Sequence, residues 1–231
     1  MNKPIKPSPE KGFSATLRGP LELRQYEPGA CATVCMANAL HMFGFEFPIS
    51  DPRYIDQQVG RQPGQPQNTN RLLLYALEHG LTLHRVDTFD DERFFEKGRA
   101  YLEEAYPEIV GPDFYQHWTD EQVALRQAAR QTECQSFAAY QTDTREIRPP
   151  DIATDIIKPL TEGKLVLFSQ SIYSKPTEGH AVLAYGISEV DGYVDLYQPR
   201  QAAGTEVLIG VDESWIKECW SPEDGVNILS I

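Results

Sequence analysis

The chain has 231 residues and a formal net charge of −13 at pH 7. Its hydrophobic residues (41%) and charged residues (24%) occur in the proportions of an ordinary globular protein, and the length suits one large domain. The negative charge argues against nucleic acid as a partner, because binding to phosphates requires clustered Lys and Arg. No stretch approaches about 18 consecutive apolar residues, so no membrane span is expected.

The N-terminal segment is rich in Pro, Lys and Ser, and we expect residues 1–20 to form an extended arm. It has no apolar region typical of a secretory signal peptide, which predicts a cytoplasmic protein; export by another route would leave no mark here. Four Cys residues in a chain of this length do not make a disulfide framework, so reduced thiols are expected. Residues 21–231 are expected to form a single domain.

The first elements follow from hydrophobic spacing and from Gly and Pro. Residues 21–26 are compatible with a short strand or a turn. Apolar residues recur with helical spacing from Cys31 to Phe43, and Gly44 is placed to form a left-handed C-terminal cap. Residues 48–70 are rich in Pro, Gly, Gln and Asn and are predicted to be largely loop.

A second helix is predicted from about Asn70 to His79, and after Gly80 a strand from Leu81 to Val86. Residues 89–148 differ from the rest of the chain because they are acidic, punctuated by aromatic residues and helical in pattern. We expect two or three helices there, inserted into the main domain or capping it. Thr119 to Gln122 fits a capping box before one of these helices.

The last third of the sequence is rich in predicted strands. A further helix begins after Pro150, and an Asp-Gly pair in "SEVDGY" indicates a hairpin turn. Helices come first and successive strands come last, which predicts an α+β fold with an antiparallel sheet. The expected strands are residues 164–172, 179–188 and 192–199, with the later segments "EVLIGV" and "GVNILSI" as further candidates.

Cys31 is the candidate nucleophile. It stands at the start of a predicted helix, where unpaired N–H groups and the helix dipole favour a thiolate, and Gly29 and Ala30 leave the sulfur accessible. The alternative is a small buried side chain, which is the commoner role of a Cys on an apolar helix. Cys35, one turn later, is expected in the core. A pair of Cys without a second pair of ligands is weak evidence for zinc, so no metal or cofactor is expected.

His180 is the candidate general base. It opens the apolar strand "AVLAYGI", from which its ring can point into a cleft at the end of the sheet, and a nucleophilic thiol needs such a partner. The alternative is a strand-edge His that is hydrogen-bonded to a loop. A third group must orient the imidazole. Gln198, at the end of the next strand, is the first candidate, and Asp195, which points to the opposite face of that strand, is the second.

Gln25 is the candidate oxyanion donor. Its amide, together with the backbone N–H of Cys31, would supply the two donors that an acyl-transfer transition state requires. The alternative is an ordinary Gln in a surface turn.

The segments "QYEPGAC", "GHAVLAYG" and "VDLYQP" together resemble papain-like cysteine peptidases, and among them the C39-like peptidase family. The helix and Gly turn of "NTNRLLLYALEHGL" resemble the same family. The similarity covers roughly residues 21–86 and 150–200. This chain departs from the family at Ala32, where Gly is frequent, and at Gln198-Pro199, where the family has Asp-Pro.

The resemblance implies a papain-like α+β fold in which the nucleophile helix packs on the C-terminal sheet and the helical segment of about 89–148 is an insertion. It implies that Cys31 is the nucleophile, His180 the general base and acid, and Gln25 the oxyanion donor. The expected activity is a cysteine peptidase or amidase acting on peptides or proteins. The same chemistry would also serve a transglutaminase, deamidase or acyltransferase, and the loss of the Asp would also suit a binding module without catalysis. The sequence does not fix the oligomeric state.

Overall fold

The computed structural model describes residues 18–46, 51–64, 68–105, 118–172, 175–187, 193–199, 208–220 and 225–231. The helices in these residues are α1 (Cys31–Met42), α2 (Arg53–Val59), α3 (Thr69–Glu78), α4 (Asp91–Lys97), α5 (Arg99–Ala105), α7 (Asp120–Ala138), the π-helix η1 (Ile152–Ile157), α8 (Lys158–Thr161) and α9 (Glu213–Cys219). The strands are β1 (Thr82–Asp87), β2 (Asp143–Ile147), β3 (Leu165–Ile172), β4 (Lys175–Ile187), β5 (Tyr193–Tyr197), β6 (Leu208–Asp212) and β7 (Val226–Ser230).

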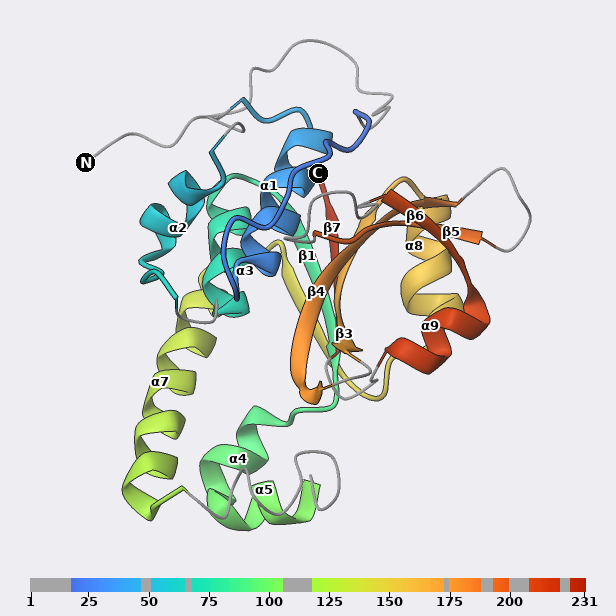
Figure 1. Ribbon diagram of the computed structural model, residues 1–231. Coiled ribbons are helices and arrows are strands. Elements are labelled where there is room, and N and C mark those ends of the chain that lie inside the picture. The colour runs from blue at the N-terminus through green and yellow to red at the C-terminus, as the bar shows by residue number, and fades with distance from the viewer. Residues whose placement is uncertain are drawn as a thin grey trace.

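The strands form one sheet of seven, in the order β2-β1-β7-β3-β4-β5-β6. Helices α1, α2 and α3 lie on one side of this sheet, α8 and α9 lie on the other, and α4, α5 and α7 extend below it (Figure 1). The fold is therefore α+β, as the sequence predicts. Within the described residues no helix is both long and apolar enough to cross a membrane.

The central strands bury both of their faces. In β4, Ala181 and Leu183 belong to the apolar cluster that contains α1, whereas Val182 and Ala184 belong to the cluster on the opposite face. This division follows from the two-residue period of a strand, which sends successive side chains to opposite faces. The continuous apolar run in the sequence of β4 is thus explained by a strand that is covered on both sides.

Helix α1 is the buried helix against which the sheet packs. Its residues are almost all buried, which suits its many Ala side chains because small residues allow close approach to the strands. The chain before it is fastened by a side chain of the same helix: the Leu21 N–H donates to Asn38 Oδ1 (2.9 Å), and Asn38 Nδ2 donates to the Leu21 carbonyl (2.8 Å). Gly44 adopts a positive φ of 85° after the helix, as expected of a left-handed cap.

Helices α4, α5 and α7 have a small apolar core of their own. Its buried members are Phe94, Tyr101, Leu102 and Val123. The capping box predicted at the start of α7 is confirmed, because Thr119 Oγ1 accepts from the Gln122 N–H and the Gln122 side chain accepts from the Thr119 N–H.

A buried ionic cluster joins these helices to the sheet. Asp91 of α4 is bound by Arg130 of α7 and by Arg145 of β2. Burial by itself would raise the pKa of Asp91, but the hydrogen bonds and charges of the two guanidinium groups outweigh it, so that this pKa is lowered. Because both partners of each pair are largely removed from water, the cluster fixes where the helices stand against the sheet.

Two elements were not predicted from the sequence. Within residues 48–70 the helix α2 occupies Arg53–Val59, although residues 51–52, 60–64 and 68 lie outside helices and strands as expected. The Pro and Gly residues that suggested a loop instead begin and end this short helix: Pro52 stands at its N-cap and Gly60 adopts the left-handed conformation at its C-cap. The buried face of the helix consists of Ile55, Asp56 and Val59, and this polar member hides its amphipathic pattern in the sequence.

The sheet is also not purely antiparallel. Strand β2 lies within the region predicted to be helical and pairs in parallel with β1, so that Leu83 is opposite Asp143. Its sequence, Asp143–Ile147, lacks the apolar alternation of a buried strand. Ionic contacts take the place of that pattern: Arg85 of β1 binds Asp143 of β2 through two hydrogen bonds of 2.9 and 2.6 Å. A parallel pair needs a long crossover, which α4, α5 and α7 provide.

Some expectations fall partly outside the described residues. Residues 1–17 of the predicted arm and the Asp-Gly turn at residues 191–192 are among those not described. Strands β4 and β5, which that turn would join, are paired antiparallel as predicted. Residues 21–26 form neither a helix nor a strand.

Candidate functional site

Cys31 is the first residue of α1 and is partly exposed. Its Sγ accepts a hydrogen bond, 3.4 Å long, from the backbone N–H of Ala181 in β4, which is 150 positions away in the chain. Ala181 directly follows His180. The packing of α1 on β4 therefore brings the predicted nucleophile into contact with the residue that follows the predicted base in the chain.

The N-terminus of α1 carries no side-chain cap. Its N-cap residue is Ala30, and no acidic residue lies in the first turn. The structure gives the backbone N–H of Cys31 no partner among the described residues, so this donor is available to a group bound at the sulfur. Five of the other helices in the described residues do have a capping side chain, namely Asn68 for α3, Asp90 for α4, Thr119 for α7, Asp151 for η1 and Asp212 for α9.

Cys35 lies one turn further into α1 and has the structural role predicted for it. It is fully buried, and its Sγ donates to the carbonyl oxygen of Ala181 at 3.4 Å. Burial raises the pKa of the Cys35 thiol well above its ordinary value, and the nearby Cys31 adds to this. The two sulfurs thus contact the N–H and the carbonyl oxygen of the same residue, Ala181 of β4, and of the two Cys only Cys31 is reachable from solvent.

His180 is partly buried and lies in the N-terminal half of β4, where it pairs with Gln170 of β3. Gln198 follows Tyr197, the last residue of β5, and is almost completely buried (1% exposed). Because Tyr197 pairs with Leu183, Gln198 stands at the end of β5 that is nearer to His180.

Asp195, the second candidate to orient His180, stands further along the strands. Its register partner in β4 is Gly186. Six residues of strand separate that position from His180, which is about 20 Å. Burial raises the pKa of Asp195. The register therefore places Gln198 nearer to His180 than Asp195.

Gln25 is partly buried and precedes the turn that leads to α1. Its Nε2 donates to the backbone carbonyl of Glu27 at 2.8 Å, which folds the side chain toward that turn. An amide nitrogen carries two hydrogens, and one hydrogen remains for a substrate oxygen.

A buried polar network fixes the turn between Gln25 and Cys31, and sequence reasoning missed it. Asp56 of α2 accepts hydrogen bonds from the Tyr26 hydroxyl, from Thr33 Oγ1 (2.6 Å) and from Arg61 Nη1 (2.7 Å). Arg61 also binds Glu27 Oε1 (2.5 Å) and the carbonyl oxygen of Pro28 (3.1 Å). The network thus contacts the turn before Cys31, through Tyr26, Glu27 and Pro28, and the first turn of α1 after it, through Thr33.

Its members are well shielded from water, since 2% of the Arg61 side chain and 9% of the Asp56 side chain are exposed. Burial, together with the Asp56 carboxylate, raises the pKa of the Tyr26 hydroxyl far above its ordinary value. No sequence motif predicts this network, because its residues come from two segments, 26–33 and 56–61, that are in contact only in the folded chain.

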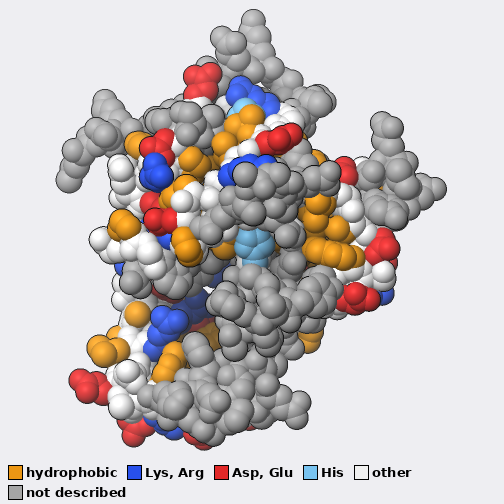
Figure 2. Space-filling model, in the orientation of Figure 1, with side chains coloured by type: hydrophobic (Ala, Val, Ile, Leu, Met, Phe, Trp, Pro, Cys, Tyr) orange, Lys and Arg blue, Asp and Glu red, His pale blue; other side chains and the backbone are white. Residues whose placement is uncertain are grey.

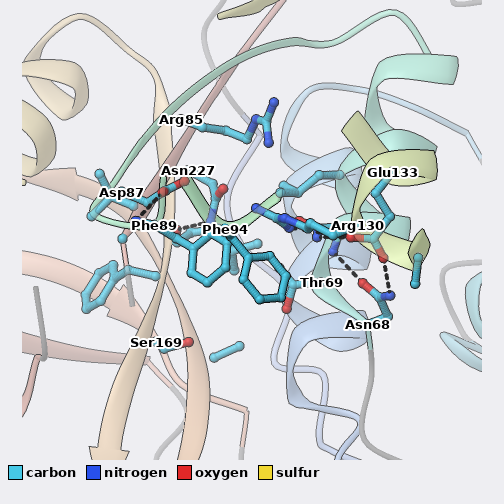
Figure 3. A pocket seen from close by; sticks show the side chains of 18 of the residues that line it. Asn68, Thr69, Arg85, Asp87, Phe89, Phe94, Arg130, Glu133, Ser169 and Asn227 are labelled. Carbon is cyan, nitrogen blue, oxygen red and sulfur yellow. Dashed lines mark hydrogen bonds and ion pairs between the residues drawn. The ribbon is translucent and has the colours of Figure 1, made fainter. Parts of the chain in front are cut away.

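A cavity of about 710 Å³ opens beside the candidate site. Its floor is the sheet face that also supports α1, and includes Ser169 and Ala181, which are opposite each other on β3 and β4. Phe89 and Phe94 stand between these strands and helix α7 (Figure 3). Figure 2 shows a hollow between the body of the molecule and the helices below it, with Lys and Arg side chains along it. The sequence pointed to a helical cover, but it did not show which side chains line the space below it.

Among the described residues, no group of three or more His, Cys, Asp or Glu side chains is placed to hold a metal ion. No protein-family model and no curated protein matches the chain.

Proposed function

We propose that the protein is a cysteine-dependent acyl-transfer enzyme, most simply a peptidase or amidase. The single observation that carries the proposal is the hydrogen bond between the Cys31 sulfur and the N–H of Ala181, because it joins the uncapped start of α1 to the residue after His180. Nucleophilic catalysis by Cys requires a thiol at such a position that is paired with a His, and in this proposal His180 is that partner.

The proposed reaction has two steps. The Cys31 thiolate attacks the carbonyl carbon of a peptide or amide bond, and the backbone N–H of Cys31 and the amide of Gln25 stabilise the negative oxygen that forms. The C–N bond then breaks as His180 gives a proton to the leaving amine. Water, deprotonated by His180, attacks the thioester and releases the acid together with the free thiol. In this proposal Gln198 orients the imidazole, as an amide does in some cysteine peptidases.

The buried environment of Cys35 makes labelling a selective test. We expect iodoacetamide at pH 6 to modify Cys31 within minutes, whereas Cys35 stays protonated and buried and does not react. Peptide mapping by mass spectrometry identifies the labelled residue. In the His180→Ala variant the rate of labelling at Cys31 should fall at least tenfold at this pH, because the thiolate loses its partner.

Activity is tested with a mixture of unstructured peptides and mass spectrometry of the products. A cut chain indicates hydrolysis, whereas a small mass change on a side chain indicates deamidation or transfer. Cys31→Ala should abolish the reaction while its circular dichroism and melting temperature stay close to those of the wild type, and Cys134→Ala is a matched control for loss of a thiol. Full turnover by Cys31→Ala would refute the mechanism.

A further inference from the structure

The cavity beside Cys31 has a composition that indicates what it binds. Ala181, whose N–H contacts the Cys31 sulfur, is one of its lining residues, whereas Cys31 and His180 themselves are not. From there it extends under α7, over Phe89 and Phe94. A volume of about 710 Å³ is in the range of cavities that enclose small organic ligands, and two or three amino-acid residues fit in such a space.

The acidic groups of the cavity are already engaged. Asp87 accepts two hydrogen bonds from Arg145, of 3.0 and 2.8 Å. Glu133 accepts from the side-chain amides of Asn68 (2.8 Å) and Asn70 (2.6 Å), and Figure 3 shows the Asn68 side chain turned toward it. Neither carboxylate is therefore directed at a ligand.

Two of the three guanidinium groups of the cavity are engaged as well. Arg85 forms a bidentate pair with Asp143, and Arg130 binds Asp91 through two hydrogen bonds, of 2.6 and 3.3 Å. Arg126 differs from them: it is exposed on α7, and its described contact is with the ring of Trp118, 5.7 Å from the guanidinium carbon to the ring centroid. Among the described residues the structure gives Arg126 no carboxylate partner.

Among the described residues that line the cavity, the uncommitted charge is thus a single positive one, at a wall of aromatic side chains, in a chain whose net charge is −13. We propose that the cavity binds an acidic peptide segment, in which an apolar side chain packs against Phe89 and an adjacent carboxylate pairs with Arg126. A guanidinium binds a carboxylate through parallel N–H donors, and the Trp118 ring holds it in place for that contact. The assignment of this segment as substrate rests on the proposed function; the binding itself does not.

The carboxylate has two sources, a Glu or Asp side chain and the C-terminus of a peptide. Three probes distinguish them: N-acetyl-Phe-Glu-amide, N-acetyl-Phe-Gln-amide and N-acetyl-Phe-Gln with a free carboxylate. Their dissociation constants are measured by calorimetry on the Cys31→Ala protein, which cannot turn them over. We expect at least one anionic probe to bind roughly 3- to 10-fold more tightly than the neutral amide. The preference should shrink at high salt, because Arg126 is exposed.

Two variants of the Cys31→Ala protein locate this binding. Arg126→Gln should remove the preference for the carboxylate. The matched control is Lys217→Gln on α9, which removes the same charge from a side chain that is 63% exposed and should keep the preference. Ala129→Phe adds a ring at the cavity wall and should weaken all three probes at least threefold.

Several results would overturn the proposal: equal affinities for the charged and neutral probes, no measurable binding at millimolar concentration, a preference that survives Arg126→Gln, or affinities that Ala129→Phe leaves unchanged. Failure of the proposed function gives a different pattern. If the wild type hydrolyses no peptide while the preference depends on Arg126, the cavity binds acidic peptides without catalysis. If the wild type hydrolyses peptides without regard to charge, the activity stands and this assignment of the cavity is wrong.

Discussion

Asp56 is the residue whose removal should disturb the candidate site most without touching the reacting groups. It lies in α2, and its carboxylate joins the turn before Cys31 to the first turn of α1 through Tyr26, Thr33 and Arg61. Asp56→Ala removes all three acceptor contacts at once. Asp56→Asn keeps an oxygen of similar shape but loses the charge that faces Arg61.

The cost follows from burial. Breaking a buried ion pair by removing one partner costs about 3–5 kcal/mol, because the remaining charge stays away from water. Arg61 keeps Glu27 and the Pro28 carbonyl, so the lower end applies and we expect about 3 kcal/mol for Asp56→Ala. For Asp56→Asn we expect about 2 kcal/mol, since the amide oxygen can still accept from one of the two hydroxyl groups and the amide nitrogen can donate to the other. In a domain of this size, 3 kcal/mol lowers the melting temperature by about 6–12 °C.

Urea unfolding followed by circular dichroism at pH 7 measures these free energies. Glu103→Gln is the matched control, since this exposed carboxylate makes no hydrogen bond or ion pair with the described residues, and it should change the stability by less than about 0.5 kcal/mol. The rate of iodoacetamide labelling at Cys31 should change in both Asp56 variants, because the turn that presents the sulfur loses its support. A loss of less than about 1 kcal/mol for Asp56→Ala would show that the network is not stabilising and would refute this reasoning.

Two further predictions concern stability. Burial raises the pKa of Tyr75 in the folded protein to about 12. The stability of the folded state is therefore independent of this hydroxyl's titration below pH 10, where it is protonated in both the folded and the unfolded state, and decreases as the pH rises from 10 to 12. Between pH 8 and pH 11 the free energy of unfolding should therefore fall by about 1 kcal/mol less in Tyr75→Phe than in the wild type; equal losses in urea unfolding would contradict the assignment. Gly225 has a positive φ of 69°, and a Cβ there would stand 2.7 Å from the Cβ of Asp87, whereas Gly80, with a φ of 88°, faces open space. Gly80→Ala should cost about 1 kcal/mol and Gly225→Ala about 3 kcal/mol or more, and comparable melting temperatures for the two variants would show that the contact at Gly225 relaxes freely.

Most of the predicted elements depend on local signals, and these signals were sufficient. The apolar spacing of α1, the Thr119 capping box and the apolar runs of β3 and β4 each specify an element without reference to distant residues. The two elements that were not predicted, α2 and β2, were missed for the same reason. In α2 and β2 the residues that hold the element in place are charged, and their partners lie far along the chain, as with Arg85 and Asp143. A hydrophobic pattern cannot reveal an element whose stability comes from such pairs.

The candidate site divides in the same way. A Cys at a helix start and a His before an apolar run are visible in the sequence, whereas the structure begins β4 at Lys175, five residues before His180. That the two side chains meet stays a prediction. The network around Asp56 and the cavity with Arg126 were not visible, because each is assembled from segments that no motif connects.

The amino-acid order by itself determined most of the helices and strands, with α2 and β2 as exceptions, and which residue types carry chemistry, since backbone preferences and apolar periodicity act over a few neighbouring positions. Only the tertiary structure decided that Cys31 meets Ala181, that Asp195 stands some six residues of strand away from His180 and that one guanidinium in the cavity is left without a described carboxylate. Such facts depend on strand register and on the docking of helices, and both are set by contacts summed over the whole chain.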